Sequence, residues 1–315
     1  MADILVTGSE GFIGRHLVRE LVKERYDVCA TYGYTPPEDM TRTRYLSHFH
    51  MDVTDFNECM KIINQEDPVV VYHLVAQPIV TTAITQPFPT MELTVRGSYN
   101  MLEALRQTGK RLKAIVYVSS DKVYGDNSNA IETDRLMGID HPYNVAKVAG
   151  DVIAQMYAKT YGLPIVISRS ANIYGGGDFH WDRLIPGVSR DIILGRHPII
   201  RSNGKQVRDY IYVSDAVQAQ MKMAWAMMNS QVPKGEIFNF GSMYPFDVQS
   251  VVDLLLETSG RGDLSPIVEN RAKGEIDVQH MDFAKAKMVL EWMPTISMKE
   301  GLERTFSWYK QWFGC

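Results

Sequence analysis

The chain starts with a short apolar run that leads directly into a glycine-rich turn. Residues 3–7 have the pattern of a β-strand, the sequence TGSEGFIG occupies 7–14, and an amphipathic stretch at 12–24 has the spacing of a helix. A strand, a small-residue turn and a helix in this order are typical of the first βαβ unit of a parallel sheet. The start of the chain therefore favours an α/β fold.

The glycines of this turn have distinct physical uses. Gly8 and Gly11 permit a tight bend and the close approach of backbone amides to a pyrophosphate, and Gly14 permits close packing of the helix on the strand. With Phe12 and Ile13, which open the helix, they are the first candidate cofactor-binding residues. A glycine-rich turn that holds no ligand is the alternative interpretation.

The alternation of strand and helix continues through the first half of the chain. Further strand-like runs lie at 27–32, 48–53, 69–74, 113–119 and 164–168, and helical patterns lie at 55–65, 90–107 and 143–161. This order predicts a Rossmann-like, doubly wound parallel sheet. The helix at 143–161 carries an apolar stripe, which we interpret as core or subunit contact.

After about residue 170 the rhythm changes, and glycine- and proline-rich segments separate shorter elements. We expect residues 1–170 to form a dinucleotide-binding domain. Residues 171–207 and 241–315 are expected to form a smaller mixed α/β substrate-binding region. The segment 208–240 is expected to return to the first domain, with a strand at 209–213 and a helix from Ser214.

Composition excludes several classes of protein. The chain has 33 basic and 37 acidic residues, a formal net charge of −4 and no dense Lys/Arg run, so a nucleic-acid partner is not expected. No apolar run approaches the ~18 residues of a membrane span. Cys29, Cys59 and Cys315 are scattered, which favours a reducing cytoplasm over a disulfide framework. The histidines show no metal-ligand spacing, so no metal site is expected.

The residues at the end of the second expected strand do not decide between NAD and NADP. An acidic residue there would bond the ribose 2′-hydroxyl of NAD, but residues 31–34 read Thr-Tyr-Gly-Tyr. Arg42 and Arg44 follow, and they either meet a 2′-phosphate or belong to a solvated loop. Asp52 and Val53 close the third expected strand, where a carboxylate can accept a hydrogen bond from the adenine amino group. We expect NAD or NADP, with a preference for NAD.

A second constellation follows the fifth expected strand. The sequence SSDKVYG occupies 119–125, and Tyr143 and Lys147 lie four residues apart, on one face of the next helix. A tyrosine of pKa near 10 must be brought close to neutrality to act as a base, at a cost of about 4 kcal/mol. A cation ~4 Å away at an effective dielectric of 20 supplies about that much. Lys147 and the positively charged nicotinamide ring are the candidate cations, and Ser120 is expected to hydrogen-bond the reacting oxygen of the substrate.

At these motifs the chain resembles the extended short-chain dehydrogenases/reductases, in particular the nucleotide-sugar epimerases and dehydratases. The motifs that carry the resemblance are TGSEGFIG, HLVAQP, SSDKVYG, YNVAK, RSANIYGGGD and RDYIYVSD. The resemblance implies a nucleoside-diphosphate hexose as substrate and a homodimer. It adds Leu74, Ala76 and Ser119, together with Tyr143 and Lys147, to the residues expected to bind the cofactor.

Asp121 and Lys122 distinguish the reactions within that family. Epimerases usually carry small or apolar residues there, whereas a 4,6-dehydratase needs an acid at C6 and a base at C5 once C4 is a ketone. The Asp-Lys pair, with AQP at 76–78, YGGGD at 174–178 and IPG at 185–187, resembles CDP-glucose 4,6-dehydratases. The resemblance assigns Asp121 as the acid and Lys122 as the base. The alternative is an ion pair that caps the loop.

The resemblance also implies the residues that hold the substrate. Tyr124, Asn172, Arg208 and Arg271 match substrate-binding positions, and the bidentate guanidinium of Arg208 suits a diphosphate. Arg169 is expected to be buried and structural. Thr94 departs from the family pattern NVxGT, and Ala146 departs from YxxSK.

The expected activity is a nucleotide-sugar 4,6-dehydratase of the CDP-glucose type. It oxidises C4 transiently, eliminates water across C5 and C6 and returns hydride to C6. A 4-epimerase or dehydrogenase of the same superfamily is the alternative, and a non-catalytic dinucleotide-binding regulator is the alternative from another class.

Overall fold

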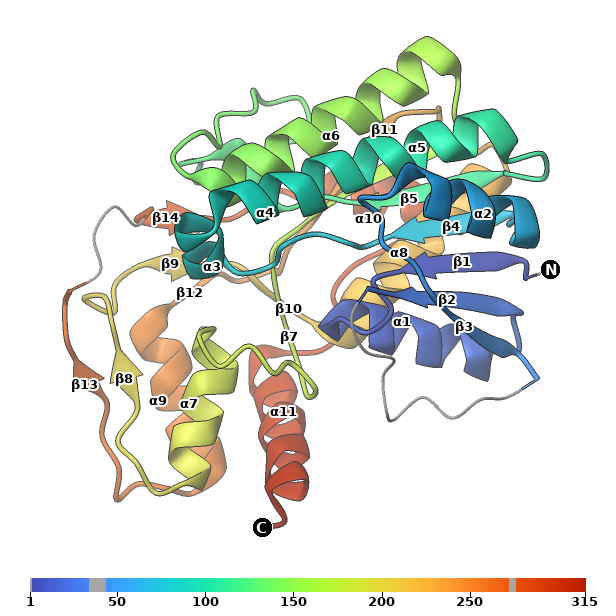
Figure 1. Ribbon diagram of the computed structural model, residues 1–315. Helices are drawn as coiled ribbons and strands as arrows, with labels where there is room; N and C mark the ends of the chain where they lie inside the picture. The colour runs from blue at the N-terminus through green and yellow to red at the C-terminus, as the bar shows by residue number, and fades with distance from the viewer. Residues whose placement is uncertain (1, 34–43, 272–275) are drawn as a thin grey trace.

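The computed structural model describes residues 2–33, 44–271 and 276–315. Its largest sheet has seven strands, all parallel, in the spatial order β11, β6, β5, β4, β1, β2, β3 (Figure 1). Their bounds are β1 Ile4–Thr7, β2 Val28–Tyr32, β3 Leu46–His50, β4 Val70–His73, β5 Ala114–Val118, β6 Ile165–Ser170 and β11 Glu236–Phe240. The strand order reverses between β1 and β4, so the sheet is doubly wound and the expected fold class is confirmed.

Helices cover both faces of this sheet (Figure 1). One face packs on α1 (Phe12–Lys23), α8 (Val213–Met228) and α10 (Ala284–Leu290), and the other packs on α2 (Phe56–Glu66), α5 (Gly97–Thr108) and α6 (Pro142–Tyr161). Strand β1 shows why both faces need cover. Ile4 and Val6 belong to the core under α1, Leu5 belongs to the core under α5, and all three are buried.

The helix expected at 90–107 is longer and less regular in the structure. After α3 (Val80–Thr85), helix α4 (Pro87–Met91) continues through a π-helical turn, η1 (Glu92–Arg96), into α5. Thr94 lies in the π-helical turn, and its hydroxyl accepts a hydrogen bond from the Gln77 amide at 3.1 Å. The turn thus ties the helix to the loop after β4.

A second region contains shorter strands. Three small sheets consist of β10 (Tyr210–Tyr212) with β7 (Asn172–Tyr174), β12 (Phe246–Asp247) with β9 (Val207–Arg208) and β14 (Val278–Gln279), and β13 (Ile267–Val268) with β8 (Ile199–Ile200). Helices α7 (Leu184–Ile193), α9 (Val248–Ser259) and α11 (Met298–Phe313) share a core of their own, which includes Ile192, Leu255 and Leu302.

Two sequence-based expectations differ from the structure. The third strand ends at His50 rather than Val53, so Asp52 lies in the loop that follows it. The strand expected at 209–213 to join the large sheet pairs instead with β7, and β11 is the strand that extends the sheet next to β6. Periodicity identifies a strand, but its pairing partner is set by tertiary packing.

Candidate functional site

A cavity of about 800 Å³ lies along the carboxyl ends of the sheet strands. Its lining comes from the turn between β1 and α1, from the ends of β2 to β6, from the start of α6 and, across the cavity, from the start of α7 and from β9 and β10. The cavity includes the point where the strand order reverses, which is where doubly wound folds bind their ligands.

Most residues predicted from the sequence meet in this cavity. The lining includes Gly8, Gly11, Phe12, Ile13, Gly14, Asp52, Val53, Leu74, Ala76, Ser119, Ser120, Asp121, Lys122, Tyr143, Lys147, Asn172 and Arg208. Tyr124 and Arg271 are not part of it. Arg42 lies outside the described residues. Arg44 lies over the ring of Tyr45, and the Cζ atom of its guanidinium is 4.5 Å from the ring centroid.

The glycine-rich turn has the shape that a pyrophosphate requires. Gly8 has φ +68°, and a Cβ on Gly14 would lie 2.2 Å from the Gly8 carbonyl oxygen, so both positions need glycine. Helix α1 begins directly after its N-cap residue, Gly11. No side chain accepts a hydrogen bond from the first amides of the helix at this cap. The first amides and the positive end of the helix dipole are therefore available to an anion in the cavity.

One buried hydroxyl points to a ligand at the same place. Among the described residues, the Ser119 hydroxyl has no hydrogen-bond partner although it is buried in the lining. Burying a hydroxyl without a partner costs about 1–3 kcal/mol, which a bound group with a polar atom would recover. The turn and this hydroxyl fit a nicotinamide dinucleotide.

The Asp52 carboxylate occupies a loop rather than a strand end. It accepts hydrogen bonds from the amide and the hydroxyl of Thr54, both at 2.8 Å. The Asp52 amide in turn donates to the Glu58 carboxylate at 2.7 Å. These bonds fix the rim of the cavity beside β3.

Tyr143 and Lys147 extend into the cavity from the first turns of α6. The Lys147 ammonium donates to the Val118 carbonyl at 3.1 Å, and burial lowers the pKa of Lys147 from its usual 10.5 to about 8. Burial also raises the pKa of Tyr143, against a smaller lowering by the Ser120 hydroxyl. Ionisation of Tyr143 therefore requires a positive charge close to its hydroxyl.

Asp121 and Lys122 form an ion pair at the edge of this group. They lie in the short 3-10 helix η2 (Asp121–Tyr124), and the Lys122 Nζ lies 3.2 Å from the Asp121 carboxylate. The Ser120 hydroxyl donates to the other carboxylate oxygen at 2.9 Å. Gln279, which the sequence interpretation missed, accepts a hydrogen bond from the Lys122 ammonium, and its amide group donates to the Gly125 carbonyl at 3.1 Å.

Two of the expected substrate contacts line the cavity from the second region. The Asn172 amide group donates to the Asp209 carbonyl at 3.0 Å. The Arg208 guanidinium donates to its neighbour's carbonyl, that of Val207, at 2.9 Å. Both residues lie on small strands, β7 and β9, and line the same cavity as Tyr143 and Lys147.

The other two expected contacts lie elsewhere. The Tyr124 hydroxyl is buried, donates to Asn239 at 2.7 Å and accepts from Arg169 at 2.8 Å. Arg169 also forms a buried ion pair with Asp151 of α6 at 2.9 Å. The Arg271 side chain is 68% exposed and pairs with Glu269 at 2.7 Å. Tyr124 thus packs within the protein beside a buried arginine.

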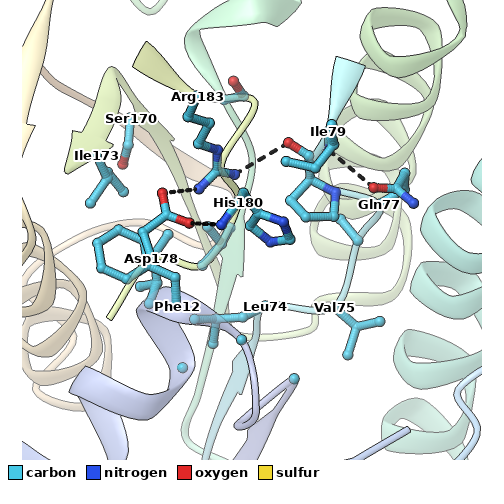
Figure 2. A pocket seen from close by; sticks show the side chains of 18 of the residues that line it. Phe12, Leu74, Val75, Gln77, Ile79, Ser170, Ile173, Asp178, His180 and Arg183 are labelled. Atoms are coloured by element: carbon cyan, nitrogen blue, oxygen red, sulfur yellow. Dashed lines mark hydrogen bonds and ion pairs between the residues drawn. The ribbon is translucent and has the colours of Figure 1, made fainter. Parts of the chain in front are cut away.

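Residues of the segment 178–183 form part of the cavity wall. Figure 2 shows the Asp178 carboxylate between the Arg183 guanidinium, at 2.8 Å, and the His180 amide, at 3.1 Å. Arg183 also donates to the Pro78 carbonyl at 3.3 Å, in the loop that carries Gln77 and Ile79. The hydrogen bond from Arg183 to Pro78 therefore joins the second region to the loop after β4.

These missed residues share one property. Arg183 and Gln279 contact the site from segments far apart in the chain, and neither belongs to a motif with fixed spacing. The described part of the chain holds no group of three or more His, Cys, Asp or Glu side chains placed to bind a metal ion. Within the same residues, every helix is too short or too polar to cross a bilayer.

Comparison with known proteins agrees with this geometry. The family model described as "NAD dependent epimerase/dehydratase family" matches residues 4–241. The chain is 29% identical to the CDP-glucose 4,6-dehydratase of Salmonella typhimurium, over 98% of this chain and 90% of that protein.

Two crystal structures show the likeness in three dimensions. One is UDP-glucose 4-epimerase of Thermotoga maritima with UDP-glucose, with a TM-score of 0.89, 28% identity and coverage of 98% of this chain and 99% of that one. The other is the dTDP-glucose 4,6-dehydratase of Streptomyces venezuelae with NAD and TYD bound, with a TM-score of 0.87, 26% identity and coverage of 99% and 98%. Dehydratases and epimerases are thus similar to this chain to about the same degree. The chain belongs to the NAD dependent epimerase/dehydratase family of enzymes.

Proposed function

We propose that the protein is a nucleotide-sugar 4,6-dehydratase of the CDP-glucose type that works with bound NAD. The observation that carries this proposal is the position of Asp121 and Lys122. A carboxyl group and an amine line the same cavity as Tyr143 and Lys147, where a sugar oxidised at C4 would present its C5 proton and C6 hydroxyl.

The cofactor would be held by residues already described. The turn at Gly8, Gly11 and Gly14 and the start of α1 would hold the pyrophosphate, and Ser119 and Lys147 line the same cavity. When bound, the nicotinamide accepts and returns a hydride, so no external oxidant is consumed.

Tyr143 acts first, as the base that takes the proton of the C4 hydroxyl. The Ser120 hydroxyl, which lowers the pKa of Tyr143, hydrogen-bonds the same sugar oxygen. The Lys147 ammonium stabilises the phenolate, and its pKa of about 8 keeps it mostly charged at neutral pH. Burial opposes the ionisation of the tyrosine, so the step depends on this added positive charge.

The ion pair between Asp121 and Lys122 prepares the elimination. Transfer of one proton from the Lys122 ammonium to the Asp121 carboxylate, across a contact of 3.2 Å, produces a neutral amine and a carboxylic acid. A sugar that excludes water from the pair favours this neutral form, because buried charges cost more than buried neutral groups. Lys122 then takes the C5 proton, and Asp121 gives its proton to the leaving C6 hydroxyl.

A direct test uses product mass. Purified protein incubated with CDP-, dTDP-, GDP- and UDP-hexoses should release a product lighter by one water from its own substrate. Lys122→Met should retain C4 oxidation and lose solvent-deuterium exchange at C5, whereas the exposed Lys110→Met should behave as wild type. Undiminished C5 exchange in Lys122→Met would remove Lys122 from the mechanism.

A 4-epimerase is the second candidate, and one observation favours it. Asp121 and Lys122 satisfy each other, and Gln279 adds a further partner for the ammonium, so the pair also suits a purely structural role in η2. Tyr143 and Ser120 are sufficient for reversible oxidation at C4. An epimerase would leave the product mass unchanged and invert C4, which nuclear magnetic resonance of the product distinguishes from elimination.

The proposal includes the substrate contacts and the assembly. Arg208 and Asn172 are placed to meet the diphosphate and the sugar, and Tyr124 and Arg271 remain proposed contacts on the resemblance alone. A homodimer through α5 and α6 is supported by the apolar side chain of Val152 on α6, which is 49% exposed. A cytoplasmic location is supported by the three cysteines, none of which forms a disulfide. Light scattering on the purified chain tests the dimer.

A further inference from the structure

The end of β2 obtains a carboxylate from an unusual source. Acidic side chains that bind the adenosine ribose normally follow the second strand, but this strand ends with Thr31 and Tyr32 and is followed by Gly33. Glu10, in the middle of the glycine-rich turn, reaches this place instead. One of its carboxylate oxygens, Oε1, accepts a hydrogen bond from the Gly33 amide at 2.9 Å.

The position of Glu10 is fixed by its neighbours. The amide and the hydroxyl of Ser9 both donate to the Thr31 carbonyl, at 3.1 Å and 3.0 Å. With the bond from Glu10 to Gly33, two consecutive residues of the turn are thus tied to the end of β2. The carboxylate is held at the strand end with little freedom to move.

The second carboxylate oxygen points to a ligand. Glu10 lines the cavity together with Thr31 and Gly33, and among the described residues its Oε2 atom is buried without a hydrogen-bond partner. A buried carboxylate oxygen requires donors, because leaving it unpaired costs more than leaving a neutral group unpaired. The two hydroxyls of an adenosine ribose are donors of the right kind, next to the turn that takes the pyrophosphate.

The cations of this area have other contacts. The Arg15 guanidinium donates to the Glu10 backbone carbonyl at 3.0 Å and lies 5.6 Å from the ring centroid of Phe179. Arg44 lies against Tyr45. Among the described residues, Glu10 thus places a carboxylate at the end of β2.

We propose that Glu10 selects NAD over NADP. Its carboxylate accepts hydrogen bonds from the ribose hydroxyls and repels a 2′-phosphate, which carries negative charge and offers acceptors where donors are needed. The inference rests on the proposed dinucleotide site and adds its specificity. In this chain Glu10, a residue of the glycine-rich turn, takes the place of the acidic residue that normally follows the second strand.

Calorimetric titration of the purified chain with NAD and with NADP tests the proposal. Wild type should bind NAD at least about tenfold more tightly than NADP, because the 2′-phosphate brings negative charge to the Glu10 carboxylate and removes a donor that it needs. Glu10→Gln keeps the length and an acceptor but removes the charge, and should reduce this preference about tenfold or more, mainly through tighter NADP binding. Glu24→Gln removes the same charge from the exposed end of α1 and should leave the preference unchanged.

The outcomes separate the two levels of inference. A wild-type chain that binds NADP as tightly as NAD contradicts the role of Glu10, whatever the variant does and whether or not it folds. Equal preference in wild type and in a folded Glu10→Gln also contradicts it, while the proposed function stands. Failure of wild type to bind either dinucleotide overturns the proposed function together with this inference.

Discussion

The two regions of the molecule are built from contacts of different range along the chain. In the half built on the large sheet, β1 leads into α1 and β3 leads into α2 within a few residues, and Gly8, Tyr143 and Lys147 all belong to motifs of fixed spacing. In the region built on α7, α9 and α11, strands of two or three residues pair with partners up to about seventy residues away. Chemistry written into local spacing can be predicted, whereas contacts between distant segments cannot.

The largest expected effect tests the motif-based half. Tyr143→Phe removes the hydroxyl that accepts the C4 proton and keeps the ring, so turnover should fall by about 10²- to 10⁴-fold. Steady-state kinetics with the preferred nucleotide hexose measure the loss, and titration with NAD should show nearly unchanged binding. Turnover within tenfold of wild type would show that another group is the base.

The second prediction concerns Lys147 and the pH dependence of stability. Burial lowers the pKa of Lys147 to about 8 in the folded chain, so between about pH 8 and its usual 10.5 the unfolded chain binds more protons. Stability must therefore rise with pH through this window, as the cost of the buried charge disappears. Relative to Lys147→Met, wild type should gain about 3 kcal/mol from pH 7.5 to 10.5, measured by urea unfolding. Parallel stability curves for the two proteins would contradict the shift.

The third prediction tests the contact between the two regions. Gln279 is buried, accepts from the Lys122 ammonium and donates to the carbonyls of Asp121 and Gly125. Gln279→Leu should lower kcat about tenfold with a smaller change in KM, and reduce stability by about 1–3 kcal/mol. Lys205→Leu, an exposed change in the same region, is the control. A change confined to KM would indicate that Gln279 contacts the substrate rather than positioning Lys122.

The smallest expected effect separates two arginines of the second region. Arg208 lines the cavity, whereas Arg271 extends to the surface and pairs with Glu269. Arg208→Ala should raise KM for the nucleotide sugar about tenfold, and Arg271→Ala should raise it less than about threefold. A larger effect of Arg271→Ala would support the contact implied by the family resemblance.

Particular residues show where the limit of sequence reasoning lies. Tyr143 and Lys147 could be placed together because a helix brings positions four apart onto one face. The close packing at Gly14 could be predicted from the glycine motif, and the structure agrees, because a Cβ at this position would lie 2.2 Å from the Gly8 carbonyl oxygen. Arg183 and Gln279 carried no such signal, because their contacts with Pro78 and Lys122 close loops of about a hundred residues or more. The strand at 210–212 was recognised, but its partner depends on the packing of β7.

The contact between Gln279 and Lys122 also constrains how such an enzyme can be recombined. Gln279 lies on β14, next to Arg208 across the pairing with β9. A chimera that takes its substrate-binding half from a relative brings a different neighbour for Lys122 in place of Gln279. A change of sugar specificity made in this way therefore also alters the surroundings of the lysine proposed to carry out the elimination. Transplanting β9 and β14 together, as one cassette, preserves their pairing.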